Sequence, residues 1–288
     1  MKRYLNYINE KKYENEYLDE VAAKNIINKF CSDFNPSNNP IYRSIQQSSD
    51  FILVKRRELR ESAYSKNYYT LLLNNLDSWS NYPKRQHICY NNDVSFNFEL
   101  YRVIPFNGAK VGVCIGDDIQ APFLENTDIT KEMIGDEIYS FIDLTRFIDN
   151  FDYKLTRLYN LPEGSFSVSE TDWYQFKEDI KKVHEYLLNN KIDWDKKYEY
   201  SNESTKKRYR EKYNKLIKYS DINELERLIK PEPLSFEVYD YKDYAKTKLD
   251  GPKTELHGYH KPVREIWLDS DILLINEKIY DEFIKTLL

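Results

Sequence analysis

The sequence predicts an α+β fold in which a large helical insertion interrupts a mostly antiparallel sheet. Short apolar segments with the spacing of strands occur within residues 41–115 and again within 263–275. Between them, apolar positions recur at helical spacing through about 100 residues. The expected parts are 1–129 for an N-terminal helix and the first part of the core, 130–232 for the helical insertion, and 233–288 for the strands and helix that complete the core.

The composition is that of a globular chain with an unusual number of tyrosines. The 288 residues are 41% hydrophobic and include 26 Tyr but only 7 Gly. Tyrosine rings supply apolar area, and each hydroxyl needs a hydrogen-bond partner when it is buried. The formal net charge of -5 gives no global basic field, so the sequence carries no strong nucleic-acid signature.

Targeting features are not evident, so we expect a soluble chain in a reducing compartment. The N-terminal residues lack the apolar run of a secretory signal peptide, and no segment reaches 18 consecutive apolar residues. The three cysteines lie far apart and form no Cys-x-x-Cys pair, so neither a disulfide framework nor a zinc ribbon is indicated. The expected location is the cytoplasm.

The N-terminal half reads as a helix followed by strands with one further helix between them. Apolar residues at helical spacing predict the first helix, which ends at a run of Asn and Pro. Asn107-Gly108 is a strong hairpin signal between two predicted strands. The predicted helices are 17–34 and 65–79, and the predicted strands are 41–45, 51–57, 85–90, 100–106 and 110–115.

The second half reads as a helical block that leads to a pair of strands. Pro231 and Pro233 end the block. The predicted helices are 131–158, 169–190, 204–219, 221–229 and the terminal 278–288, and the predicted strand pair is 263–268 with 272–275.

Glu265 is the strongest single candidate for chemistry. Alternate residues of a strand share a face, so Glu265 lies on the face of Val263 and Trp267. A carboxylate between large apolar neighbours is costly unless it is paired or used. It either forms a salt bridge or reaches solvent, or it polarises a hydroxyl and stabilises a developing cation.

Four arginines are candidates for binding an anion, because a guanidinium binds a phosphate bidentately. Arg57 and Arg60 lie three residues apart at a turn and could hold the same anion, whereas surface salt bridges with nearby Glu residues are the alternative. Arg43 shares a strand face with Ile41 and Ile45. Arg56 completes the set.

The segment 84–93 begins with basic residues, continues as a predicted strand and ends with polar residues. Arg85 is one of the basic residues at its start. Tyr90 could stack on a ring of a ligand, and Asn91 could form a hydrogen bond with an amide. The alternative is an ordinary strand followed by a turn.

Two further patterns are weaker. His257 and His260, with Glu255 nearby, lack a second ligand pair, so no metal is expected. The basic residues from Lys206 to Lys218 indicate a solvated helix face or a surface for an anionic partner.

Several of these pieces together resemble ADP-ribosyltransferase-like proteins of bacteriophages. They are an Arg-rich turn (Arg57 to Ser62), a helix (68–79), the strand that runs from Pro83 to Tyr90, the Pro-containing Val103-Ile104-Pro105-Phe106, and the late Arg264-Glu265-Ile266-Trp267. The resemblance covers about a third of the chain, and it implies a location in the cytoplasm of a host cell or in a virus particle.

The resemblance implies an ADP-ribosyltransferase-like fold and a glycosyl transfer that uses NAD as its substrate. Arg57 or Arg43 would contact the phosphates, and Glu265 would hold the ribose hydroxyl and stabilise the cationic state formed as nicotinamide leaves. Arg60, Arg85, Tyr90 and Asn91 would complete the NAD site. The family shows Ser or Thr in its middle strand, where this chain has Cys89-Tyr90-Asn91.

Two functions follow from these observations. One is an NAD-dependent ADP-ribosyltransferase that modifies a macromolecule, with a host or phage protein as the target. The alternative is a non-catalytic virion or host-interaction protein that retains the scaffold, with the helical block as its binding or assembly surface. The sequence leaves the oligomeric state open.

Overall fold

The computed structural model describes residues 15–36, 39–46, 48–56, 73–93, 98–114, 116, 173–189, 199–228, 231, 236–247, 249 and 263–287. Within these ranges the protein is of mixed α and β type with a large antiparallel sheet, which confirms the coarse fold prediction. The chain divides into two compact units. The first comprises Met1–Tyr64, Trp79–Pro122 and Ser235–Leu288, and the second comprises Ser65–Ser78 and Phe123–Leu234.

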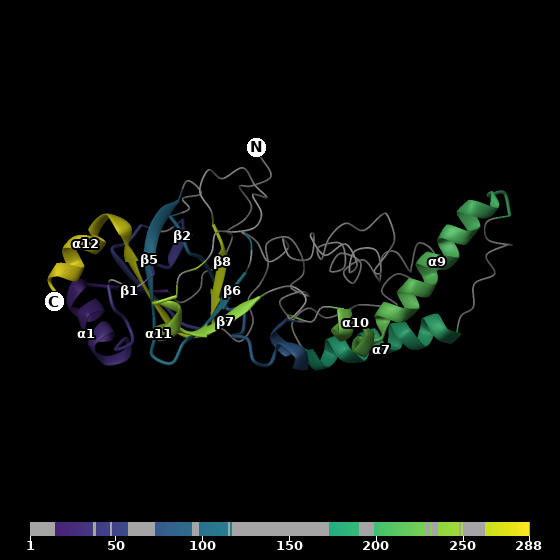
Figure 1. Ribbon diagram of the computed structural model, residues 1–288, viewed down its shortest axis with the longest axis horizontal. Helices are drawn as coiled ribbons and strands as arrows, with labels where there is room; N and C mark the ends of the chain where they lie inside the picture. The colour runs from purple at the N-terminus through teal and green to yellow at the C-terminus, as the bar shows by residue number, and fades with distance from the viewer. Residues whose placement is uncertain are drawn as a thin grey trace. The chain divides into compact units, whose positions relative to one another are not determined.

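The first unit contains the sheet (Figure 1). Its nine described strands are antiparallel at each pair and follow the order β1-β3-β9-β5-β2-β4-β8-β6-β7. The strands are β1 Glu16–Leu18, β2 Tyr42–Ile45, β3 Phe51–Val54, β4 His87–Tyr90, β5 Glu99–Pro105, β6 Lys110–Val113, β7 Glu237–Asp240, β8 Glu265–Leu268 and β9 Ile272–Asn276.

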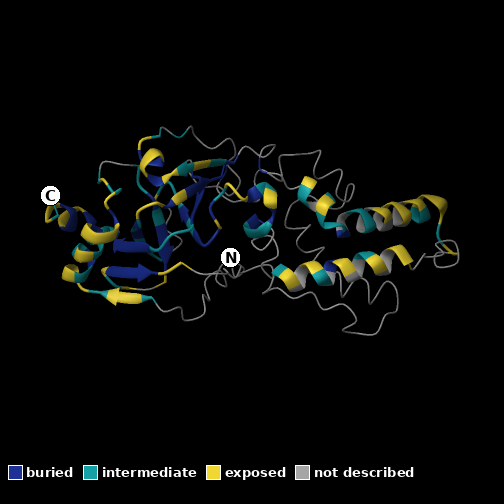
Figure 2. Ribbon diagram, turned by 90° about the horizontal axis from the view of Figure 1, so that it is seen from below, coloured by how far each residue is buried: buried dark blue, intermediate teal, exposed yellow. Residues whose placement is uncertain are grey.

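Strand composition explains the order. The strands β3 and β9 are almost entirely apolar, are buried on both faces and lie side by side within the sheet. The strands β1 and β7 lie at the two edges, carry exposed residues and were not predicted as strands. Figure 2 shows this contrast between buried inner strands and an exposed edge.

The predicted hairpin between β5 and β6 is wrong, although the turn itself forms. Gly108 has a φ of 75°, which glycine adopts without strain. The turn residues bond to the end of the first helix instead of joining two paired strands. Asn107 N donates to Phe30 O at 2.7 Å, Asp33 N donates to Asn107 Oδ1 at 3.1 Å, and Gly108 N donates to Asp33 Oδ2 at 3.2 Å.

The predicted pairing of β8 with β9 is also wrong, because three strands separate them in the sheet. Four strand spacings in a flat sheet amount to about 19 Å. The link from Leu268 to Ile272 can span only about 14 Å. The sheet is therefore strongly curved. Phe106 N, in the link between β5 and β6, donates to Asp271 O, in the link between β8 and β9, at 3.1 Å.

Apolar clusters cover both faces of the curved sheet. On the face of Ile266 and Leu268, one cluster joins residues from seven strands with Tyr241 and Tyr244 of the short helix α11 Tyr241–Tyr244. On part of the other face, α1 Glu20–Phe30 and α12 Glu277–Lys285 pack together against β9 and β5 (Figure 1).

Both covering helices begin at the side-chain caps that their sequences supply. Asp19 Oδ1 accepts from Ala22 N at 2.7 Å at the start of α1. Asn276 Oδ1 accepts from Lys278 N at 3.0 Å at the start of α12.

The second unit contains the helices α7 Trp173–Asn189, α9 Glu203–Ser220 and α10 Ile222–Leu228, close to three of the predicted helices. His184 of α7 joins α9, because its Nδ1 lies 2.8 Å from Ser220 Oγ and 3.1 Å from Ile217 O. Nothing among the described helices is both long and apolar enough to cross a membrane. The predicted helix 131–158 and most of 65–79 lie outside the described residues, although a short 3-10 helix, Asp77–Trp79, falls at the end of the latter.

Candidate functional site

Glu265 is buried and paired with an arginine. Glu265 is the first residue of β8 and is 3% exposed. Arg85, also 3% exposed, reaches it from just before β4. Nε and Nη2 of Arg85 both donate to Glu265 Oε1, at 3.0 and 2.8 Å. A charge-assisted pair of this kind compensates both residues for the loss of water.

The backbone around Glu265 is fixed on both sides of β8. Glu265 N donates to Gly116 O at 2.8 Å, and Cys114 N donates to Glu265 O at 2.9 Å. On the β4 side, Asn91 and Arg264 exchange two bonds, with Arg264 N to Asn91 Oδ1 at 2.7 Å and Asn91 N to Arg264 O at 3.2 Å. The carbonyl oxygen of the Asn91 side chain, predicted to bind a cofactor, is thus engaged with the neighbouring strand.

A second contact holds the segment that carries Arg85 against β8. Trp267 Nε1 donates to Pro83 O at 2.9 Å. The Trp267 ring also covers Gly112, where a Cβ atom would lie 2.2 Å from the indole. Phe236 meets the same indole edge-on, with ring centroids 5.7 Å apart. The ion pair is therefore flanked by a closely packed aromatic group.

Tyr90 lies beside Glu265 in the sheet. The register places Tyr90 directly opposite Glu265, Tyr42 opposite Tyr90, and Arg102 opposite Tyr42. Because opposite residues of paired strands share a face, these four side chains form a row across β8, β4, β2 and β5. We call the face that carries this row the Glu265 face.

Arg102 ends this row, and no pattern in the sequence singles it out. Its guanidinium lies 4.7 Å from the ring centre of Tyr42 and 4.2 Å from that of Tyr280, and it donates to both carboxylate oxygens of Glu277, at 3.2 and 2.9 Å. Burial works against the charge, but the bonds to Glu277 raise the pKa of Arg102 overall. Arg102 thereby fastens α12 to the sheet.

Arg43 lies on the opposite face from Glu265. It follows Tyr42 in β2, and strand neighbours point to opposite faces. Arg43 Nη1 lies 3.3 Å from Nδ1 of His87, and His87 is 1% exposed. Arg57 and Arg60 lie outside the described residues, as do His257 and His260. Of the predicted site residues, the structure therefore brings together Glu265, Arg85, Tyr90 and Asn91.

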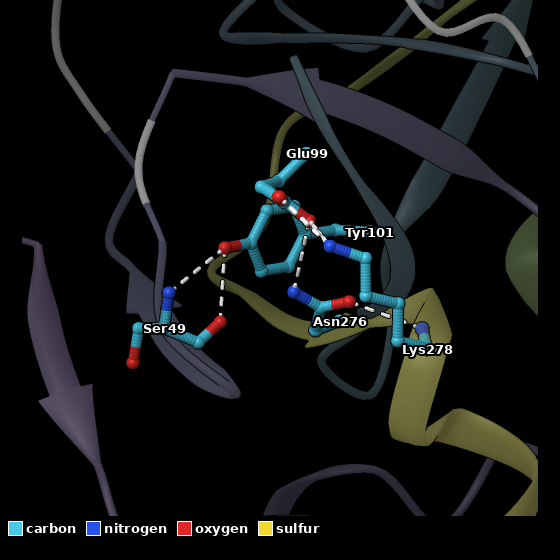
Figure 3. Close-up of polar contacts among 5 residues, drawn as sticks. All are labelled: Ser49, Glu99, Tyr101, Asn276 and Lys278. Atoms are coloured by element: carbon cyan, nitrogen blue, oxygen red, sulfur yellow. Dashed lines mark hydrogen bonds and ion pairs between the residues drawn. The ribbon is translucent and has the colours of Figure 1, made fainter.

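Figure 3 shows a polar group where β5 begins and β9 ends. Lys278 Nζ donates to both oxygens of Glu99, at 2.9 and 2.7 Å, and these bonds lower the pKa of that carboxyl. The Tyr101 hydroxyl donates to Ser49 O at 2.9 Å and accepts from Ser49 N at 3.2 Å. The bonds of Tyr101 hold the loop between β2 and β3 against β5, so this group has a structural role.

A small hollow with room for about one water molecule, partly open to solvent, lies elsewhere on the first unit. No predicted site residue lines it. Its walls come from the chain around residues 34–41, from Arg102 and Val103, and from Tyr241 and Tyr280. Arg102 is already bonded to Glu277 there, so the hollow offers little charge for a ligand.

Among the described residues, no group of three or more His, Cys, Asp or Glu side chains is placed to hold a metal ion. Comparison with known proteins gives no match to a family model, a curated protein or a solved structure.

Proposed function

We propose that the protein is a non-catalytic interaction protein, of the kind found in a virion or in host takeover by a bacteriophage. The observation that carries this proposal is the burial of Glu265 in its ion pair with Arg85. A carboxylate that stabilises a reacting sugar must lie within hydrogen-bond reach of a substrate hydroxyl. Glu265 instead accepts two bonds from a guanidinium while its residue is 3% exposed.

Energetics support a structural role for this carboxylate. Removing one partner of a buried ion pair costs roughly 3–5 kcal/mol, because the other charge is left without compensation. Freeing Glu265 for a substrate would carry a cost of this kind. Arg85 also belongs to the segment whose carbonyl at Pro83 accepts from Trp267, so movement of Arg85 would disturb that packing.

A transfer assay tests the proposal. The protein is incubated with labelled NAD and a bacterial lysate, beside a Glu265→Gln variant. We expect neither protein to transfer label. Label transfer by the wild type that Glu265→Gln abolishes, with the variant still folded by circular dichroism, would contradict the proposal.

The second candidate function is ADP-ribosyl transfer on a sheet of the ADP-ribosyltransferase-like type. One observation favours it, namely that Tyr90 and Glu265 lie side by side on one face. An aromatic ring beside a carboxylate suits a nicotinamide riboside, with the ring for stacking and the carboxylate for the ribose. In this case Arg85 would have to release Glu265 when NAD binds.

Calorimetry distinguishes the second candidate. NAD that binds to the wild type, with affinity lost in both Tyr90→Ala and Glu265→Gln, would support it. Absence of binding heat at millimolar NAD would exclude ADP-ribosyl transfer and leave the non-catalytic interaction protein as the proposed function.

A further inference from the structure

The helix α9 is strongly basic within an acidic chain. Among its 18 residues, seven are Lys or Arg and two are Glu, whereas the whole chain has a net charge of -5. A local excess of this size produces a positive potential around the helix, which the net charge of the chain conceals. The neighbouring helix α7 carries three Lys and three acidic residues, so the excess is particular to α9.

The ion pairs within α9 leave most of this charge in place. Glu203 contacts Lys206 and Arg210, with N–O distances of 3.1 and 3.8 Å. Glu211 contacts Lys207 at 3.9 Å. Two carboxylates cannot neutralise seven cations, and surface pairs of this kind contribute only about 0–1 kcal/mol each. A polyanion can therefore take the place of these carboxylates at little cost.

The exposed side of α9 is polar and faces away from α7 (Figure 2). On the inner side, Ser220 Oγ and Ile217 O lie 2.8 and 3.1 Å from His184 Nδ1 of α7. The exposed residues among those described in α9 are Glu203, Ser204, Lys207, Arg210, Glu211 and Asn214. All six are polar or charged, so this surface does not have the apolar character with which an amphipathic helix enters a bilayer.

The sequence extends the basic pattern along the helix. Positions 208, 212 and 215 hold Arg, Lys and Lys, and successive members are four and three residues apart, which places these positions on one face. Position 215 is five residues, or about 140° of helix rotation, from Ser220 on the inner side. From 207 to 218 the basic positions cover about 17 Å of helix, which is long enough to contact several phosphates of a nucleic acid.

An exposed tyrosine lies beside the start of this basic helix. Tyr200 is 98% exposed and precedes the N-cap residue Asn202 by two positions. A ring this exposed adds little to a core, but it offers a flat surface to a nucleic-acid base. A single strand supplies both a chain of phosphates and unpaired bases that are open to stacking, whereas a duplex keeps its bases stacked on one another.

We propose that α9 and Tyr200 bind a single-stranded nucleic acid. The cations of α9 contact the phosphates, and the Tyr200 ring stacks on a base. An acidic protein would match the charge of α9 but would bring no base to Tyr200. The inference rests on the proposed function, because it names the partner class of a non-catalytic interaction protein.

Fluorescence anisotropy of the full chain tests the proposal with labelled oligo-dT, oligo-U, a DNA duplex of the same length and polyglutamate. We expect at least one of the two single strands to bind, and binding of only one would identify DNA or RNA as the partner. With about five phosphates neutralised, the affinity should fall about 100-fold between roughly 50 and 200 mM salt. No binding to either strand would overturn the proposal, and so would equally tight binding of the duplex or of polyglutamate.

Two variants test the residues. Lys207→Gln, Lys212→Gln and Lys215→Gln together should weaken binding of the single strand more than tenfold at low salt and reduce the salt slope by about 2. Tyr200→Ala should weaken binding about tenfold and leave the salt slope unchanged, because it removes stacking and no charge. Affinity equal to that of the wild type in either variant would overturn the proposal.

The matched control replaces Lys177, Lys181 and Lys182 of α7 by Gln, which changes the net charge by the same amount. Gln is a good helix former, so both triple variants should keep their helices, as circular dichroism would show. The control should bind the strand within about twofold of the wild type, and a loss as large as that of the α9 variant would overturn the assignment to α9. Failure of the nucleic-acid site leaves the non-catalytic proposal standing, since the labelled-NAD assay tests that proposal separately.

Discussion

At the scale of residues, burial determines what the charged side chains of the sheet can do. Glu265 and Arg85 are both 3% exposed and bond to each other, so each stabilises the other in place of water. Lys278 and Glu99 form an ion pair as short as theirs near the surface. Such an exposed pair contributes only about 0–1 kcal/mol, whereas loss of one partner from the buried pair costs several times more.

The need for a partner to Glu265 was predictable from sequence, but the identity of that partner was not. Alternation placed the carboxylate between Val263 and Trp267, which predicted that it is paired or used. Arg85 lies 180 residues away along the chain, and only the register of β4 with β8 brings it close. The same limit applies to Arg102 with Glu277 and to Arg264 with Glu237, whose atoms meet at 2.9 and 3.4 Å.

A prediction at this scale concerns Tyr280. Burial raises the pKa of Tyr280 to about 12, whereas an unfolded tyrosine has a pKa of about 10. Between these values the unfolded chain loses a proton that the folded chain keeps, so the free energy of unfolding falls as pH rises from about 10 to about 12. Tyr280→Phe should reduce this fall, as measured by urea midpoints across the window.

Tyr200→Phe is the control, because Tyr200 is 98% exposed. It should leave the pH dependence unchanged. An equal effect of the two substitutions, or no effect of Tyr280→Phe, would contradict the account of Tyr280.

At the scale of elements, the strands were predictable and their partners were not. Periodicity identified seven of the described strands to within a few residues, and it missed β1 and β7, which are short edge strands with exposed side chains. The Asn107-Gly108 signal predicted a turn correctly. The hairpin pairing that it also predicted does not form, because β5 pairs with β9 and β2 instead of β6.

Gly112 in β6 provides a prediction about packing between elements. An added Cβ would lie 2.2 to 2.6 Å from three atoms of the Trp267 indole, which is held by its bond to Pro83. Gly112→Ala should therefore lower the free energy of unfolding by about 3 kcal/mol. Gly108→Ala meets no atom within 4 Å and is strained only by its φ of 75°, so it should cost about 1 kcal/mol.

Urea unfolding of the two alanine variants measures the difference. Similar costs for both, or a larger cost for Gly108→Ala, would mean that Trp267 does not cover Gly112 as described.

At the scale of the whole molecule, the sheet is the most deeply buried part of the first unit. Ile272 to Ile275 of β9 are each 0% exposed, and β9 is paired on both sides, with β3 and β5. Hydrogen exchange should therefore be slowest in β9 and β5, where opening requires global unfolding. The edge strands β1 and β7 should exchange much faster, and mass spectrometry of peptic fragments would show the order. Exchange in β9 as fast as in β1 would contradict this topology.

The helices α7, α9 and α10 were predictable from the sequence, since they lie within the stretch of helical spacing. The curvature of the sheet had none. It follows from two short links, 106–109 and 269–271, joining strands that three others separate. Such a constraint exists only once the strand order is known.

A double-mutant cycle on Arg85→Met and Glu265→Leu tests most directly whether the buried pair is structural. Each single variant leaves one charge buried alone and should lower the free energy of unfolding by roughly 3–5 kcal/mol. The double variant replaces the pair with apolar side chains, so it should cost far less than the sum of the two. Additive effects, or single variants as stable as the wild type, would contradict the structural role of the pair. Glu265 would then again be a candidate for a catalytic role.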